Sequence, residues 1–313
     1  MNLGSLLGTS ATELGLRFNL VGIFPSTTLV IFILTLIWSG APGSEPQLSI
    51  VIETIKELET TESLFLIFIV IALSLIMQPL QLSLVRILEG YWGGSRLGIF
   101  LSQKGIDIQK QRRRKLDDCQ RIPPLSNKEI DRVKMAIHAA KQLSKSYPSE
   151  DRLLPTAFGN VLRAAEGVPE RQYGLDAVVL WPRLYPLLPD EMKRILADRR
   201  NQLDMAVRFC AVFLLAAIIS TAFLFRYGFW LIIPVLNIVL AWLSYQAAIS
   251  AAFAYGESIV ASFDLHRFDL LKALHLPLPS NRDTEKENGK ILSDFLRQGA
   301  SEEGSTNFQY MHQ

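Results

Sequence analysis

The chain has 313 residues, of which 49% are hydrophobic and 20% are charged, and its formal net charge is +2. Such a balance excludes nucleic-acid binding through overall charge. The two cysteines, Cys119 and Cys210, are too few for a disulfide framework or a thiolate metal site.

The apolar residues are concentrated in four stretches that contain no Asp, Glu, Lys or Arg, namely residues 18–44, 63–85, 209–225 and 227–256. A helix needs about 20 apolar residues to cross a bilayer. The third stretch reaches that length if residues 205–207 are added, because the long side chain of Arg208 can extend to the headgroups. The sequence therefore predicts an all-α polytopic membrane protein with spans at about 20–40, 63–86, 205–225 and 228–256. We expect the first span to be retained, since its apolar run exceeds the 7–15 residues of a signal peptide.

Charge asymmetry predicts the orientation of these helices. The loop at residues 41–62 contains one lysine, Lys56, whereas residues 86–128 contain ten lysines and arginines. Basic loops remain in the cytoplasm. We therefore predict a first transmembrane hairpin at 1–89 with its loop outside, a basic helical cytoplasmic domain at 90–203, a second hairpin with a cytoplasmic helical extension at 204–276, and both termini in the cytoplasm.

Between and after the hairpins, apolar spacing predicts further elements in chain order. The outer loop contains an amphipathic segment at 48–58. In the cytoplasmic domain, a helix ends at Tyr147–Pro148, and two short helical pieces at 156–166 and 175–180 are separated by residues 167–169, where Gly and Pro interrupt the pattern. One long helix runs from Asp190 to Phe225. The fourth span continues as a helix to Leu274, and the polar residues 277–313 are predicted to form a disordered tail.

The segment at residues 152–189 is the first candidate for ligand or partner binding, because charged and aromatic side chains occur together among its prolines. The candidates are Arg163, Glu166, Arg171, Tyr173, Asp176, Trp181 and Arg183. Alternatively, the charges hold an irregular segment together through salt bridges and helix caps.

A second polar cluster follows the fourth span and contains Asp264, His266, Arg267 and Asp269. Asp264 and Arg267, and likewise His266 and Asp269, are three residues apart and can pair on a helix. We interpret the cluster as a structural ion-pair network in preference to a metal or acid–base site.

Two further features concern packing and lipids. Ala248, Ala252 and Gly256 form a row of small residues that suits close helix packing, within the bundle or at an oligomer seam. The basic run at Arg112, Arg113, Arg114 and Lys115 determines topology and can attract anionic headgroups. Phosphate-loop, dinucleotide, HExxH and GxSxG signatures are absent, so we predict no catalytic residue, cofactor or metal, and no nucleic acid partner.

Several motifs occur together along the chain: FNL at 18–20, ILEGYWG at 87–93, LPTAFGNVLRAAE at 154–166, YGLDAV at 173–178, WPRL at 181–184 and FDLHR at 263–267. In this order they resemble a family of uncharacterised bacterial integral membrane proteins, over most of the chain except its tail. The resemblance implies a location in the bacterial inner membrane and supplies no activity.

Two classes of function follow from these patterns. The first is a non-enzymatic membrane scaffold or effector whose cytoplasmic domain binds a protein partner or a ligand. The second is an oligomeric channel or transporter, although the intramembrane polar residues Gln78, Gln81, Asn237, Tyr245 and Gln246 are few for a conducting path. A membrane-embedded enzyme is the third.

Overall fold

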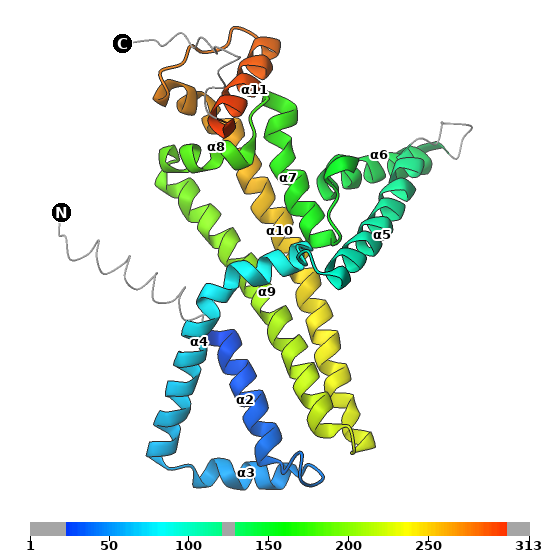
Figure 1. Ribbon diagram of the computed structural model, residues 1–313, viewed down its shortest axis with the longest axis vertical. Helices are drawn as coiled ribbons and strands as arrows, with labels where there is room; N and C mark the ends of the chain where they lie inside the picture. The colour runs from blue at the N-terminus through cyan, green and yellow to red at the C-terminus, as the bar shows by residue number, and fades with distance from the viewer. Residues whose placement is uncertain (1–22, 121–128, 299–313) are drawn as a thin grey trace, which may run out of the picture. The chain divides into compact units, whose positions relative to one another are not determined.

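The computed structural model describes residues 23–120 and 129–298, and within these ranges every regular element is a helix (Figure 1). The predicted all-α class is therefore confirmed. The chain divides into two compact units. Among the described residues, unit 1 comprises 23–88 and 201–248, and unit 2 comprises 89–120, 129–200 and 249–298. Unit 2 thus combines the predicted domain at 90–203 up to Arg200 with residues that follow Ala248, whereas residues 201–203 belong to unit 1.

Two described helical runs are long and apolar enough to cross a membrane. They are α9 (Asp190–Leu224) and Gly228–Ala273, which contains α10 (Ile232–Ala273). A third candidate combines α3 (Leu48–Glu57) with Thr60–Ile76, the first part of α4 (Thr60–Glu89), although the two parts meet at 108°. The apolar helix α2 (Phe24–Trp38) is shorter. The predicted long helix from Asp190 is confirmed, as is the helical continuation of the fourth span.

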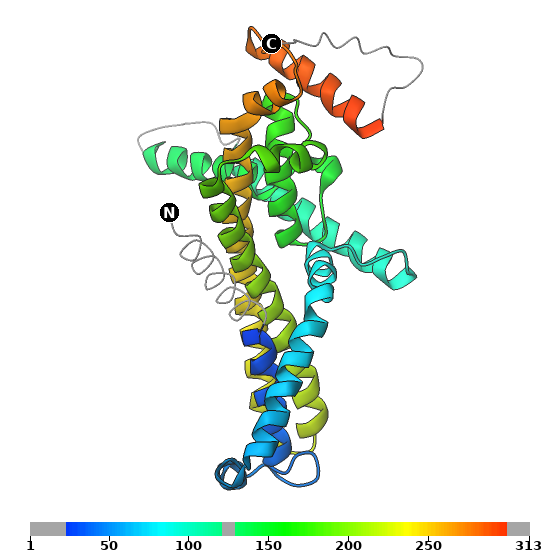
Figure 2. The same cartoon turned by 90° about the vertical axis from the view of Figure 1, so that its left-hand side faces the viewer.

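Unit 1 is held together by apolar contacts between α2 and the helices of the second hairpin. Leu29 of α2 packs with Val212 and Ala216 of α9, and Leu36 packs with Leu224. Their branched and small side chains interlock at helical spacing. The amphipathic α3 confirms the segment predicted in the outer loop, and it connects α2 with α4 (Figures 1 and 2).

Arg208 of α9 differs from its prediction. Its side chain is only 6% exposed, and its Nε donates a hydrogen bond to Gln81 Oε1 of α4 at 2.5 Å. The Gln81 amide in turn donates to the carbonyl oxygen of Asp204 at 3.4 Å. The expectation that Arg208 extends outward was wrong, because the neighbouring helix supplies a polar acceptor that a buried guanidinium requires.

Unit 2 contains α5 (Arg96–Gln120), α6 (Glu129–Ser146), α7 (Ala157–Tyr173), α8 (Ala177–Leu184) and α11 (Arg282–Gln298), together with parts of α9 and α10. Short 3-10 turns occur at Glu150–Arg152 and Tyr185–Leu187. The main core brings together Leu180 and Leu184 of α8, Phe263 and Leu270 of α10 and Leu292 of α11. All five side chains are at most 3% exposed. As predicted, α6 ends before Tyr147–Pro148.

The break predicted at residues 167–169 was wrong, whereas the second helical piece predicted at 175–180 is present as α8 and extends to Leu184. Helix α7 continues through Gly167 and Pro169 and ends at Gly174, whose φ of 73° lies in the left-handed region that suits a glycine cap. Phe158 is fully buried on this helix, and Pro169 is buried as well. Burial of one face therefore outweighs the single hydrogen bond that the proline removes.

The predicted disorder of residues 277–313 was wrong for residues 282–298, which form α11, and residues 299–313 lie outside the described ranges. Asn281 begins this helix, because its Oδ1 accepts a hydrogen bond from the amide of Thr284 at 2.8 Å. Leu292 and Leu296, four residues apart, pack into the core of unit 2. The polar composition of the segment concealed this short apolar stripe.

Candidate functional site

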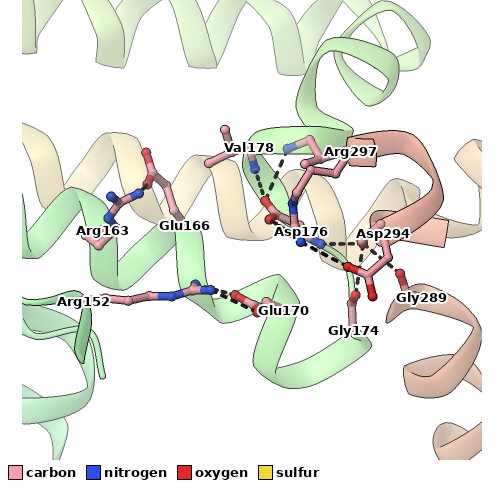
Figure 3. Close-up of polar contacts among 12 residues, drawn as sticks. Arg152, Arg163, Glu166, Glu170, Gly174, Asp176, Val178, Gly289, Asp294 and Arg297 are labelled. Carbon is pink, nitrogen blue, oxygen red and sulfur yellow. Dashed lines mark hydrogen bonds and ion pairs between the residues drawn. The ribbon is translucent and has the colours of Figure 1, made fainter. Parts of the chain in front are cut away.

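A pocket of about 540 Å³ lies where α7, α8 and α11 meet. Its lining includes three arginines and three acids, contributed by all three helices and by the 3-10 turn before α7 (Figure 3). They are Arg152, Arg163, Glu166, Glu170, Asp176 and Arg297. We call this the charged pocket.

Two of its acids have structural partners. Arg152 forms a paired contact with Glu170, with nitrogen–oxygen distances of 2.5 and 3.2 Å (Figure 3). This hydrogen bond raises the pKa of Arg152, which stays charged. Asp176 caps α8 by accepting from the amides of Val178 and Val179, and its other oxygen pairs with Arg297. These contacts connect α11 and the turn before α7 to the α7–α8 corner.

Glu166 is held less firmly. Its carboxylate lies 3.4 Å from Arg163, whose guanidinium also donates to the hydroxyl of Tyr91 at 3.2 Å. Burial raises the pKa of Glu166 despite the attraction of Arg163, because removal of water disfavours the charged form. Among the described residues, Glu166 therefore has one long ion-pair contact, and the Nε atom of Arg163 beside it is buried without a hydrogen-bond partner.

A second pocket of about 240 Å³ shares Glu166 and Val178 with the charged pocket. It is lined by the aromatic rings of Trp181 and Tyr255 and the aliphatic side chains of Leu162 and Ile259, with Glu89 and Arg200 as further polar groups. We call it the aromatic pocket. A small apolar cavity with a few polar groups is the usual form of a small-molecule site.

The other candidates at residues 152–189 have separate contacts. Arg171 lies 3.5 Å from the carbonyl oxygen of Ala164, and Arg183 donates to that of Val179 at 2.7 Å. Tyr173 donates to Asp264 at 2.7 Å. Burial, followed by the adjacent Asp264 carboxylate, raises the pKa of Tyr173. The predicted group of seven is therefore not one site: Arg163, Glu166, Asp176 and Trp181 line the two pockets, whereas Arg171, Tyr173 and Arg183 do not.

The cluster on α10 is extended by α11. His266 Nδ1 and Asp269 Oδ2 are 2.9 Å apart, as their spacing predicts. Arg267 instead pairs with Glu285 at 2.7 Å and contacts only the carbonyl oxygen of Asp264, so the predicted Asp264–Arg267 side-chain pair was wrong. The carboxylate of Glu285 on α11 is therefore the ion-pair partner of Arg267, in place of the Asp264 carboxylate on the same helix as Arg267. Within the described ranges, no group of three or more His, Cys, Asp or Glu residues could hold a metal ion.

The structure also shows the surroundings of the predicted row of small residues on α10 and of the basic run on α5. Ala248 and Ala252 are fully buried, and Gly256 lies against Ala165 of α7, where close approach leaves no room for a larger residue. Arg113 and Arg114 pair with Glu150 at 3.3 and 3.9 Å. Arg112 and Lys115 line a different groove of unit 2.

Sequence reasoning missed several residues of the two pockets, namely Arg152, Arg200, Tyr255 and Arg297. An amphipathic stripe over residues 282–298 was the available signal for Arg297, whereas the others are brought in by tertiary folding alone. Comparisons with protein-family models, with curated proteins and with solved structures found no significant match to this chain.

Proposed function

We infer that this protein is a non-enzymatic scaffold or effector of the bacterial inner membrane, with four spans and both termini in the cytoplasm. Its cytoplasmic part binds a ligand or a partner at the junction of the charged and aromatic pockets. The spans are supported by the two long apolar helices and by the charge-free stretches around α2 and α4. The orientation is supported by the excess of basic residues after the second span.

One observation carries the binding role: Glu166 belongs to both pockets and has only a weak ion-pair partner. A desolvated carboxyl group is stabilised by a cationic or hydrogen-bonding group that enters from the charged side. An adjoining apolar group would then contact Trp181 and Tyr255, whose faces also attract cations. The ligand class supported best is an amphipathic organic cation or a peptide segment with a basic and an aromatic side chain.

Native mass spectrometry of the full-length protein, purified from its own membranes, tests this role. We expect a retained small molecule or peptide in the wild type, and loss of that mass in Trp181→Ala and Glu166→Gln. Glu191→Gln is the matched control, since Glu191 is exposed in the first turn of α9 and lines neither pocket. Equal retention in all variants would refute a ligand site at this junction.

The topology has a separate test. In intact cells a membrane-impermeant maleimide should label Ser49→Cys of the outer loop, made in a Cys119→Ser background. The native Cys119 is exposed on α5 and should react only after permeabilisation. Labelling of Cys119 in intact cells would contradict the proposed orientation.

The channel or transporter alternative is favoured by one observation. Arg208 and Gln81 form a buried polar pair near the cytoplasmic ends of two helices assigned to the membrane, and ionisable residues within membrane spans often belong to a transport path. Ion flux in liposomes that contain the purified protein, lost on Ala252→Leu, would support this alternative over the scaffold. A flux-silent protein would reject it.

A further inference from the structure

We propose that a groove between α5, α6, α7 and α10 binds a phospholipid with an anionic headgroup. This inference rests on the proposed membrane location of the chain. The groove has a volume of about 850 Å³ and lies wholly within unit 2. Its lining includes the exposed cations Arg112, Lys115, Lys141 and Lys145, which we call the rim, and the less exposed apolar residues Ile249 and Phe253, which we call the floor. We call it the basic groove.

Helical spacing groups the cations of the rim in two pairs. Arg112 and Lys115 are three residues apart on α5, and Lys141 and Lys145 are four apart on α6, so each pair shares one helix face. Lys145 pairs with Glu257 at 2.5 Å. Among the residues that the structure describes, Arg112, Lys115 and Lys141 form no ion pair. The groove therefore holds an excess of positive charge that an anionic group would neutralise.

The floor of the groove is apolar. Ile249 and Phe253 are four residues apart on α10, and both are only partly buried. Leu116 of α5 and the buried Val161 of α7 complete this surface. A cationic rim over an apolar floor fits a molecule with an anionic head and a hydrocarbon chain, because each part contacts a surface of its own kind.

The position of the floor along α10 favours a membrane lipid as this molecule. Both floor residues belong to the charge-free stretch at 227–256, and Glu257 is the first charged residue after it. A helix that starts at Ile232 and rises 1.5 Å per residue crosses a core of roughly 30 Å in about 20 residues, which is near Ala252. The floor thus lies at the cytoplasmic boundary of the bilayer, where phospholipid headgroups are found.

The basic run on α5 supplies a matched control. Arg112 and Lys115 line the groove, whereas Arg113 and Arg114 pair with Glu150. Two double variants, Arg112→Gln with Lys115→Gln and Arg113→Gln with Arg114→Gln, remove the same charge from the same helix. A diffuse attraction between the basic run and the bilayer would be weakened equally by both. Binding in the basic groove would be weakened by the first double variant alone.

The full-length protein, purified in dodecyl maltoside, would be titrated with phosphatidylglycerol or phosphatidylcholine and the bound lipid counted by native mass spectrometry. We expect the wild type to retain phosphatidylglycerol selectively. The Arg112→Gln and Lys115→Gln pair should bind it roughly thirtyfold more weakly, since each basic residue contributes about 1 kcal/mol and 1.4 kcal/mol is a factor of ten. The control pair should change binding by less than about threefold.

A second readout locates the lipid. Cys119 is exposed and lines the groove, whereas Cys210 is buried, so N-ethylmaleimide should modify Cys119 first. Phosphatidylglycerol should slow that modification in the wild type and in the control pair, but not in the groove variant. Circular dichroism would show that every variant keeps its helices.

Several outcomes would overturn the proposal. Two concern lipid binding: equal weakening of phosphatidylglycerol binding by the two double variants, and retention of phosphatidylcholine equal to that of phosphatidylglycerol. A third is unchanged reactivity of Cys119 when lipid is bound. The fourth is displacement of the lipid by a lower concentration of a polyglutamate peptide, which would identify the occupant as an acidic protein segment. The titration in detergent does not depend on orientation or on the Glu166 junction. It therefore fails or succeeds independently of the maleimide labelling and of the Trp181→Ala experiment.

Discussion

Ser293 of α11 provides a direct test of how the C-terminal helix is attached to unit 2. Its side chain is 3% exposed, and its Oγ accepts a hydrogen bond from the amide of Asp176 at 2.9 Å. The same oxygen lies 2.7 Å from the carbonyl oxygen of Gly289 and 3.1 Å from that of Gly174. Ser293→Ala removes the acceptor and leaves the amide of the partly buried Asp176 without it.

The magnitude follows from the cost of a buried unsatisfied donor, which is about 1–3 kcal/mol. If α11 opens locally, this cost appears as amide exchange that is roughly 5 to 150 times faster in peptides covering residues 282–298. Hydrogen–deuterium exchange of the full-length protein in detergent measures it. Peptides from α9 should be unchanged, because the substitution affects a local opening and not global unfolding.

Asp294→Asn is the control for this experiment. Asp294 is the next residue along α11, its side chain is exposed, and it pairs with Arg297 at 3.0 Å. An exposed pair contributes less than about 1 kcal/mol, so exchange should accelerate by less than about fivefold. Unchanged exchange in Ser293→Ala, or an equal effect of Asp294→Asn, would refute the assignment of Ser293 as the attachment point.

Three other predictions concern stability. Glu166→Gln should raise the unfolding temperature at about pH 7.5 but not at about pH 4, because burial raises the pKa of Glu166 and its contribution to stability is lost as pH rises through that pKa. Equal shifts at both pH values, measured by differential scanning fluorimetry, would contradict this prediction. Gln81→Leu should destabilise unit 1 by roughly 1.5–3 kcal/mol in mixed-micelle unfolding, because Arg208 loses a buried acceptor, and an unchanged midpoint would count against the pair. Asn160→Ala should accelerate tryptic cleavage after Arg152, because the side-chain amide of the buried Asn160 forms hydrogen bonds with both the N–H and the C=O of Leu154, at 2.8 and 2.9 Å. An unaltered cleavage rate would show that these bonds do not hold the turn.

The helices that sequence reasoning located correctly have strong local signals. The continuous helix from Asp190 and the long extension of α10 follow from apolar residues at helical spacing over more than 30 positions. The amphipathic helix at Leu48–Glu57 has the same origin. Local errors arose where burial overrides propensity, as in α7, which passes through Pro169 because its buried face holds it in place.

The candidate site was predicted only in part, for a related reason. Arg163 and Glu166 are three residues apart, so their pairing could be anticipated from one helix. The partner of Asp176 is Arg297, which is 121 positions away in a segment that the sequence predicts to be disordered and that forms α11. No local pattern indicates which of several distant arginines reaches a given carboxylate.

The sequence by itself determined the helical class and the positions of the longest helices, two of which are long and apolar enough to cross a membrane. These properties depend on composition and on the spacing of apolar residues within about 20 residues of the chain. Only the tertiary structure decided that Arg208 meets Gln81, that Glu166 joins two pockets, and that the basic run divides between Glu150 and an apolar-floored groove. Such contacts depend on how distant helix faces are brought together, because a charged side chain is stabilised by whichever partner packing places within reach.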